Sequence, residues 1–573
     1  MNYDFKISKK TIIEDGLSKD KIAKKVSKQF YKYLKDNEIY PEHKEPIIHE
    51  DDDYVYIDIP VELDSKEMQE KAEAVLSVKM TGEAKFMKAA EDDYNLNVYN
   101  QENYKATYPG SASSLGAQKN IPKTKDGEPD YHWNHKQARF DKAIEILKAE
   151  KPMGSKLNTL NGQTGLKVFQ LDTGCSAHSS LTGSTSYKQN EAKNFDDANN
   201  DSPNPEQDKY VMLKMAKGNM MKPGHATSTA YTMVGHNQNP PSEEDFVPVV
   251  KLPHVKGYPG LLSKDFGKAL FPYVDFYPLR VGPVVTYANG AIRKLFNTKL
   301  LGTYTSDSLN IAKGVEYARQ NNADVMTMSI GGKFKDKVLR GNMLNAYNQG
   351  IIMVCAAGNS RAADLIEDVV SPGDYPHTIA AAAIAPQAKA DGSGTEIVPW
   401  EKSCDGPGTD ISAPGKYIYT AAKFDINRMN EPGVDKATFL DGNLYKFGGA
   451  TSQATVHVAS AAAMWKFYYK NILDTPFYNE KKGRIVEAFR WALYRSRIIP
   501  ENWNEKRFTD KSTKAKYKGC LNAEGILDPK YAPTDATCQK FAEWMSDEIS
   551  DPKNKKRGFN RYKKFCRQNG LTA

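Results

Sequence analysis

The chain of 573 residues lacks several features that would place it in a specialised class of protein. Its six cysteines are too few and too scattered for the disulfide framework of a small secreted domain. No segment approaches the roughly 20 consecutive apolar residues that a transmembrane helix needs. The formal net charge is only +8, which does not indicate specific nucleic-acid binding. We therefore expect a globular protein that neither spans a membrane nor binds a particular nucleic acid.

The beginning of the sequence shows no apolar stretch of the kind found in a secretory signal peptide. Cys175, Cys355 and Cys404 fall in segments expected to form core strands or strand ends, where buried free thiols are ordinary. The three cysteines near the C-terminus would pair only in an exported protein. These features favour a cytoplasmic location, with export by another route as the alternative.

Composition divides the chain into four segments. Residues 1–115 are charged and irregular, and a strand-like run at 54–63 is typical of a small α+β unit. Residues 116–130 form a linker, because Gly, Pro and Lys are frequent there. The main domain covers 131–535, and a basic helical tail covers 536–573. Aromatic residues alternate with Lys and Arg in this tail, which indicates an amphipathic surface helix rather than a docking site for nucleic acid.

Short apolar runs alternate with helical patterns in the main domain. Near-continuous apolar runs of this length are typical of parallel strands that are buried on both faces. Alternation with helices predicts an α/β fold with a doubly wound, mainly parallel sheet, whose functional groups gather at the carboxyl ends of the strands. The apolar runs lie at 165–172, 274–281, 323–330, 350–357 and 377–384.

Four side chains of this domain have the chemistry of a serine nucleophile and its supports. Ser452 opens an Ala-rich helical pattern, His225 begins another, and Asp172 ends an apolar run. A nucleophilic serine needs a base and a carboxylate that orients the base, and the amide of Asn359 would donate to an oxyanion. Taken singly, each residue also has a structural alternative, such as a helix N-cap for Ser452 or a turn for Asn359.

The chain order Asp, His, Asn, Ser and the flanking motifs resemble the subtilisin-like (subtilase, S8-type) serine peptidases over roughly residues 130–530. The matching motifs are "LDTG", "GHATSTA", "AAGN" and "GATSQATVHVA". The resemblance implies a subtilisin-like fold and a serine endopeptidase whose catalytic residues are Asp172, His225 and Ser452, with Asn359 in the oxyanion hole. The alternative is a catalytically impaired subtilase-fold protein that binds peptides or partners.

The same resemblance implies how a protein or peptide substrate is bound. An extended peptide would add as a strand beside the segment "SIGG", using main-chain hydrogen bonds. A second segment, "AAG", would line the pocket for the residue that precedes the cut. The implied substrate-binding residues are Ser329, Ile330, Gly331, Ala356, Ala357 and Gly358.

Three positions depart from the family's motifs. Ala226 and Ala450 stand where the family has glycine, and Val456 stands where it has proline. None of the three changes removes a chemical group that the reaction needs, so an active enzyme is favoured.

No cofactor is expected to be required, and Ca²⁺ is the metal to be considered. Four residues of an acidic segment are spaced loosely like a calcium-binding loop, but the central glycine is missing and two prolines interrupt it. A solvated loop is therefore favoured over a metal site. The four weak candidates are Asp197, Asn199, Asp201 and Asp208.

Residues 1–115 have a role implied by the family, in which many members carry an N-terminal propeptide. Such a segment would inhibit the site intramolecularly and be removed by cleavage in the linker. A permanent accessory domain is the alternative.

Overall fold

The computed structural model describes 29 segments of the chain, and all structural statements below refer to them. Contacts between Cα atoms divide the chain into two compact units, residues 1–103 with 335–339, and the rest. The described residues are 2–8, 18–36, 40, 42–50, 54–62, 106–107, 120–124, 127, 130–149, 165–175, 178, 180–181, 186–195, 203, 225–235, 261–262, 274–282, 284–287, 301–304, 308–332, 336–359, 369–389, 391–400, 402–404, 408–422, 444–500, 503, 519–550 and 558–572.

The first unit is an α+β structure built on a central antiparallel strand. Strand β4 (Tyr54–Glu62) pairs with β1 (Asn2–Ser8), β2 (Glu42–His43) and β3 (Ile47–Glu50), all antiparallel. Helix α2 (Lys19–Asp36) buries residues spaced three or four apart, which is the pattern of a helix with one apolar face. Those buried residues are Ala23, Ser27, Tyr31 and Leu34.

The second unit is organised by an eight-stranded sheet in the order β14-β13-β12-β11-β6-β8-β7, with β15 also paired to β13. Every pairing in it is parallel except that of β14 with β13, which confirms the predicted mainly parallel α/β fold. The strands are β6 (Leu166–Asp172), β7 (Lys193–Asn194), β8 (Val274–Arg280), β11 (Val325–Met328), β12 (Ile352–Ala356), β13 (Ile379–Ala388), β14 (Thr395–Pro399) and β15 (Ile411–Pro414).

Strand β6 lies where the order of the sheet reverses. The chain adds β8 on one side of β6 and then returns to add β11, β12 and β13 on the other side. In doubly wound sheets the crevice at such a reversal, outside the carboxyl ends of the strands, is where ligands bind. The topology therefore directs attention to the residues at the ends of β6 and β11.

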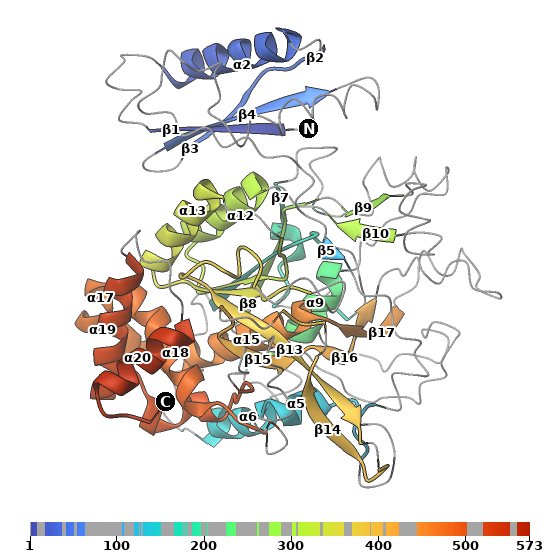
Figure 1. Cartoon of the computed structure of the whole chain (residues 1–573), viewed down its shortest axis with the longest axis vertical. Helices are drawn as coiled ribbons and strands as arrows, with labels where there is room; N and C mark the ends of the chain where they lie inside the picture. Colours follow the sequence, from blue (N-terminus) through green and yellow to red (C-terminus); the bar gives the residue numbers. More distant parts are fainter. Residues whose placement is uncertain are drawn as a thin grey trace, which may run out of the picture. The chain divides into compact units, whose positions relative to one another are not determined.

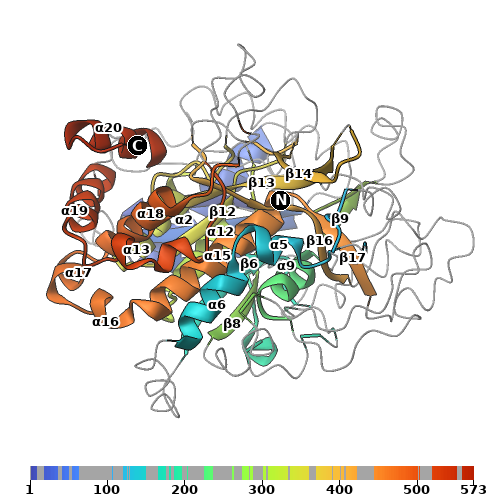
Figure 2. The same cartoon turned by 90° about the horizontal axis from the view of Figure 1, so that it is seen from below.

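Helices cover both faces of this sheet. Helix α12 (Ser308–Gln320) packs on β6, and α15 (Thr451–Tyr468) packs on β11, β12 and β13. Figures 1 and 2 show these two helices on opposite sides of the strands. Helix α9 (His225–Val234) lies beside α15 and contacts β6. The remaining helices of the sheet region are α5 (Trp133–Gln137), α6 (Phe140–Ala149), η3 (Gln189–Glu191) and α13 (Lys337–Asn348).

Two smaller sheets complete the strands of the second unit. The short strand β5 pairs with β10, and β10 pairs with β9, all antiparallel. The hairpin of β16 and β17 is also antiparallel and contacts α9 through β16. These strands are β5 (Ala106–Thr107), β9 (Val284–Tyr287), β10 (Leu301–Tyr304), β16 (Lys416–Ala422) and β17 (Leu444–Gly449).

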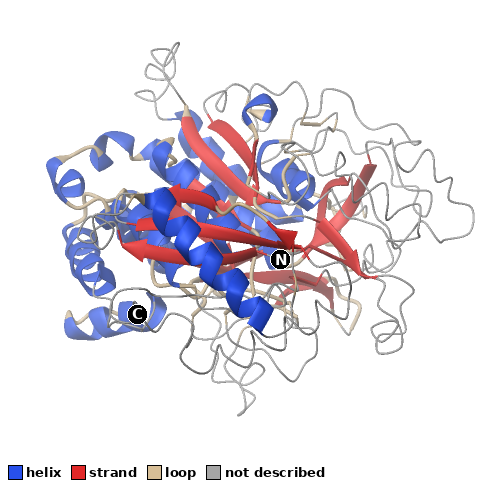
Figure 3. Ribbon diagram, turned by 90° about the horizontal axis from the view of Figure 1, so that it is seen from above, coloured by secondary structure: helices blue, strands red, loops and turns tan. Residues whose placement is uncertain are grey.

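The C-terminal helices form a packed layer, seen on the left of Figures 2 and 3. Aromatic rings of α18 (Gly483–Ser496), α19 (Ala536–Ser550) and α20 (Gly558–Gln568) meet around Trp491, whose ring lies 5.2 Å from that of Phe541 and 6.0 Å from that of Phe565. Helix α20 buries its apolar residues, among them Phe559 and Phe565, and exposes polar ones such as Lys564 and Arg567. The other elements here are α16 (Lys470–Leu473), α17 (Pro476–Glu480), η7 (Gly525–Leu527) and η8 (Pro529–Tyr531).

Arg490, which forms a buried ion pair within α18, anchors this helix to the sheet. Arg490 donates to both carboxylate oxygens of Glu487 at 2.7 Å and to the carbonyl oxygen of Thr378 at 2.8 Å, just before β13. Arg490 is 1% exposed and Glu487 is fully buried, so breaking the pair would leave an uncompensated buried charge.

All six cysteines lie in the described part of the chain, and each is a buried free thiol. Within the described residues, none of the helices combines the length and the apolar character needed to cross a bilayer.

A buried histidine joins α15 to α5. His457 Nδ1 lies 2.7 Å from the carbonyl oxygen of Gln453 and must donate to it, so Nε2 accepts from the amide of Asn134 at 2.9 Å. Burial lowers the pKa of His457 to about 4, so the imidazole is neutral in the folded protein at neutral pH.

We expect this histidine to make stability depend on pH. Because its folded pKa lies below the unfolded value, its contribution is complete above about pH 6.5 and is lost as pH falls toward 4. The variant His457→Gln should reduce the fall in the free energy of unfolding over this range by on the order of 2–3 kcal/mol in urea titrations. His43→Gln, which changes an exposed histidine on β2, is the control variant. Equal slopes for His457→Gln and the parent would contradict this prediction.

Candidate active site

The carboxylate of the candidate site is held at the end of β6. Asp172 is the last residue of this strand and is fully buried. Its Oδ1 accepts one hydrogen bond from the backbone N–H of Thr173 at 2.7 Å and another from His225 Nδ1 at 2.7 Å. Two donors on one oxygen fix the direction of the carboxylate.

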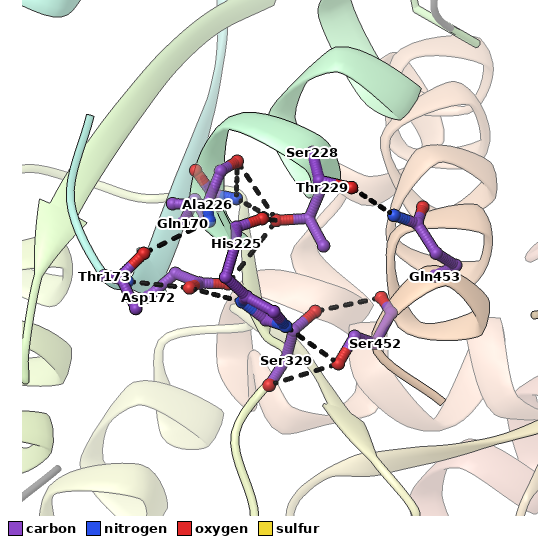
Figure 4. A network of polar contacts seen from close by, with 10 residues as sticks. All are labelled: Gln170, Asp172, Thr173, His225, Ala226, Ser228, Thr229, Ser329, Ser452 and Gln453. Carbon is purple, nitrogen blue, oxygen red and sulfur yellow. Dashed lines mark hydrogen bonds and ion pairs between the residues drawn. The ribbon is translucent and has the colours of Figure 1, made fainter. Parts of the chain in front are cut away.

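The base is held at the start of α9. The backbone N–H of Ala226 donates to Thr173 Oγ1 at 3.2 Å, which attaches the first turn of the helix to the end of β6. Since Asp172 accepts the proton on His225 Nδ1, Nε2 is the ring nitrogen that can accept a proton, and it lies 3.2 Å from Ser452 Oγ. Figure 4 shows the three side chains in line, although 53 and 227 residues of sequence separate the two contacts.

The serine is held at the start of α15. Ser452 is the second residue of this helix and is 9% exposed. Its backbone N–H lies in the first turn, where no carbonyl of the same helix precedes it as an acceptor. Ser329, which follows β11, donates its hydroxyl to the carbonyl oxygen of Ser452 at 2.9 Å. The nucleophile candidate is thus joined to the carboxyl end of a central strand.

Asn359 lies beside the serine at the carboxyl end of β12. Its Oδ1 accepts from the backbone N–H of Thr451 at 3.1 Å and from the Thr451 hydroxyl at 2.8 Å. Because the oxygen end of the amide is engaged on Thr451, the Nδ2 end points the other way. This orientation suits a donor to an anion that forms next to Ser452.

The predicted substrate-binding residues follow two neighbouring parallel strands. Ser329, Ile330 and Gly331 come after β11, and Ala357 and Gly358 come after Ala356, the last residue of β12. A Cβ on Gly331 would lie 2.3 Å from Val370 Cγ2, and one on Gly358 would lie 2.8 Å from the same atom. The two segments therefore approach Val370 more closely than any other residue type would permit.

The three departures from the family's motifs are all buried. Ala226 and Val456 lie in regular helix. Ala450 has φ 128° and ψ −179°, a conformation that is almost restricted to glycine and costs about 1–3 kcal/mol for other residues. Its N–H donates to the carbonyl oxygen of Gly415 at 2.6 Å, and its carbonyl oxygen accepts from Gln453 at 3.1 Å. These bonds hold the strained residue two positions before the serine.

The four weak calcium candidates lie outside the described residues. Within the part of the chain that the structure describes, no group of three or more His, Cys, Asp or Glu side chains could hold a metal ion.

The structure contains a polar network behind the site that the sequence did not predict. Gln453 Nε2 donates to Ser228 Oγ at 3.0 Å, and Thr232 Oγ1 donates to Gln453 Oε1 at 2.8 Å, which joins α15 to α9 (Figure 4). Gln170 on β6 donates to Thr229 Oγ1 at 2.6 Å. The signal in the sequence was the frequency of Ser and Thr in "HATSTAYT", a helix with no exposed face.

Comparisons with known proteins agree with this arrangement. A family profile described as "Subtilase family" matches residues 163–489, more than half of the chain. The chain is 30% identical over 171 residues to subtilisin of Bacillus pumilus, covering 30% of this chain and 52% of that protein. It is 30% identical over 171 residues to subtilisin E of Bacillus subtilis, covering 30% and 38%. It is 31% identical over 195 residues to a thermostable alkaline protease of Halalkalibacterium halodurans, covering 34% and 44%. The chain thus spans about half or less of the length of the curated relatives that it matches.

We expect residue 450 to control the placement of Ser452. Glycine adopts the observed backbone conformation without strain, so Ala450→Gly should react with a fluorophosphonate probe at least as fast as the parent. Ala450→Val should react about a hundredfold more slowly, because a β-branched side chain would shift the serine by about 1 Å. The measurement is the second-order rate of covalent labelling. Parent-like labelling of the valine variant would contradict the prediction.

Proposed function

The chain belongs to the subtilase family, and on this premise we propose that it is a serine endopeptidase acting through Asp172, His225 and Ser452. The observation that carries the proposal is the continuous hydrogen-bonded line from Asp172 Oδ1 through His225 to Ser452 Oγ, with distances of 2.7 and 3.2 Å. Such a line lets the hydroxyl lose its proton as its oxygen attacks a carbonyl carbon.

The reaction follows from the positions of the donors and acceptors. Ser452 Oγ bonds to the peptide carbonyl carbon while its proton passes to His225 Nε2. The imidazolium then gives this proton to the leaving amine as the peptide C–N bond breaks, which leaves an acyl group on Ser452. A water molecule, deprotonated by His225, attacks the acyl carbon and releases the carboxylic acid, and Ser452 regains its proton.

The negative charge that develops on the carbonyl oxygen needs fixed donors. Asn359 Nδ2 and the backbone N–H of Ser452 are the two groups proposed for this role. Support comes from the bonds between Asn359 Oδ1 and Thr451, which turn the amide nitrogen away from Thr451 and hold it without reorganisation.

The substrate proposed is a protein or peptide bound in extended form. The segments that follow the neighbouring strands β11 and β12 flank the site, and the substrate strand is proposed to bond to their main chain.

Covalent labelling tests the activity directly. We expect a fluorophosphonate probe to label the parent chain and to leave Ser452→Ala unlabelled, since the probe bonds to the activated hydroxyl. Ser460→Ala is the matched control, because Ser460 is a buried serine of the same helix whose hydroxyl bonds to the carbonyl oxygen of Val456. An unlabelled parent, or equal labelling of Ser452→Ala, would overturn the proposed function.

We also propose that residues 1 to about 115 inhibit the site intramolecularly and are removed by cleavage within 107–130. The proposal is supported by the compact α+β unit that residues 1–103 contribute. We expect the labelled species to lack these residues, so its intact mass should be well below the 64.0 kDa of the full chain. A labelled species of full length would contradict removal, and equal labelling rates before and after cleavage would contradict inhibition.

A further inference from the structure

Asp172 has two carboxylate oxygens, and the bonds described so far involve only Oδ1. The side chain is fully buried, so Oδ2 has no access to solvent water. Among the described residues, the hydrogen-bond donor that reaches Oδ2 is the hydroxyl of Thr229, on α9 one turn after His225, at 3.4 Å. A buried carboxylate oxygen without a donor is costly, which gives this single contact its importance.

The Thr229 hydroxyl has one proton and three acceptors within reach. They are Asp172 Oδ2 at 3.4 Å, the carbonyl oxygen of His225 at 3.2 Å and that of Ala226 at 3.1 Å. The carbonyl of His225 faces the N–H four residues later in the helix, and the carbonyl of Ala226 accepts from Gln170 at 3.1 Å. Of the three acceptors, only Asp172 Oδ2 has no other donor among the described residues. An ionised carboxylate oxygen also accepts a stronger hydrogen bond than a neutral carbonyl oxygen does.

Gln170 determines which way this hydroxyl points. It lies on β6 two residues before Asp172, so both side chains project from the same face of the strand. Its Nε2 donates to the carbonyl oxygen of Ala226 and, at 2.6 Å, to Thr229 Oγ1. The carbonyl oxygen of Ala226 can only accept, so the group of Gln170 that faces it must be the amide nitrogen. The same nitrogen faces Thr229 Oγ1. The Thr229 oxygen therefore accepts from Gln170, and its own proton is left to donate.

Gln170 makes this contact at a cost. It is 1% exposed, and its Oε1 has no hydrogen-bond partner among the described residues. An apolar side chain at this position of a buried strand would avoid that cost. The residue is thus placed for its two donors rather than for packing alone.

We propose that Thr229 and Gln170 are positioning residues of the catalytic triad, with Thr229 donating to Asp172 Oδ2 and Gln170 directing the Thr229 hydroxyl. The proposal rests on the proposed function. In this role Thr229 stabilises the negative charge of Asp172 and keeps Oδ1 of the same carboxylate directed at His225.

The sign of the effect on activity follows from charge. The Asp172–His225 pair is anionic when His225 is neutral and has no net charge when His225 is protonated. A donor on Oδ2 stabilises the anionic state more, so its removal favours proton uptake and moves the acidic limb of the pH–rate profile to higher pH. Other titratable neighbours of Asp172 are Tyr187, Cys175 and Arg280, whose strand β8 pairs with β6, and they remain unchanged in the variants below.

The test compares Thr229→Val with Thr227→Val in the chain as purified. Thr227 lies on the same helix, is fully buried, and has a hydroxyl with no partner among the described residues, so its replacement should leave the profile unchanged. For Thr229→Val we expect the acidic limb of fluorophosphonate labelling to move up by about 0.5–1 pH unit. We expect the maximal labelling rate to fall about tenfold. Thr229→Ser, which keeps the hydroxyl, should restore both.

Gln170 is tested through its dependence on Thr229. Gln170→Met should move the limb in the same direction by less, and adding it to Thr229→Val should have no further effect on the profile. Superimposable profiles for Thr229→Val and Thr227→Val would overturn the proposal. If Thr229→Val does not fold, a parent-like profile for Gln170→Met, or a displaced one for Thr229→Ser, would overturn it.

An outcome in which the parent is never labelled would contradict the proposed function, and the role of Thr229 then has a separate measurement. At pH 7 the free energy of unfolding of Thr229→Val should be lower than that of Thr227→Val, because only Thr229→Val leaves the buried Oδ2 of Asp172 without its donor. Equal free energies of unfolding for the two variants would overturn the proposal.

Discussion

A carboxylate enclosed at the end of β6 is the interaction on which the rest of the site depends. Asp172 has no solvent to share its charge, so every hydrogen bond that it needs must come from the protein. Thr173 and His225 supply two of these bonds, and Thr229, one turn after His225 on α9, supplies the hydroxyl beside the second oxygen. The need to satisfy one buried charge thus fixes where α9 begins and how its histidine ring is turned.

The sheet brings this carboxylate to the serine. Because the strand order reverses at β6, the segment after β11 lies next to the end of β6, and Ser329 there bonds to the backbone of Ser452. Helix α15 is buried over most of its length, and His457 and Gln453 tie it to α5 and α9. The nucleophile is therefore held by rigid helices and strands rather than by a loop, which suits a reaction that tolerates little displacement.

Much of this arrangement could be predicted from the sequence, because its strongest signals are periodic. The apolar run at 165–172 became β6 almost without change, and that at 323–330 became the shorter β11, since Ser329 leaves the sheet to bond with Ser452. The roles of Gln170 and Thr229 could not be predicted. A glutamine in a core strand and a threonine in a buried helix are two isolated exceptions to their patterns, and only the fold places them together.

The aromatic cluster around Trp491 has a consequence for how the molecule is made. Rings from α19 and α20 complete the surroundings of a side chain on α18, which itself anchors to β13 through Arg490. This part of the core cannot close until Phe565 has left the ribosome, long after the serine and its partners have been synthesised. During synthesis the α18 face carries uncovered indole and phenol rings, so the nascent chain passes through a period in which chaperones have an apolar surface to hold.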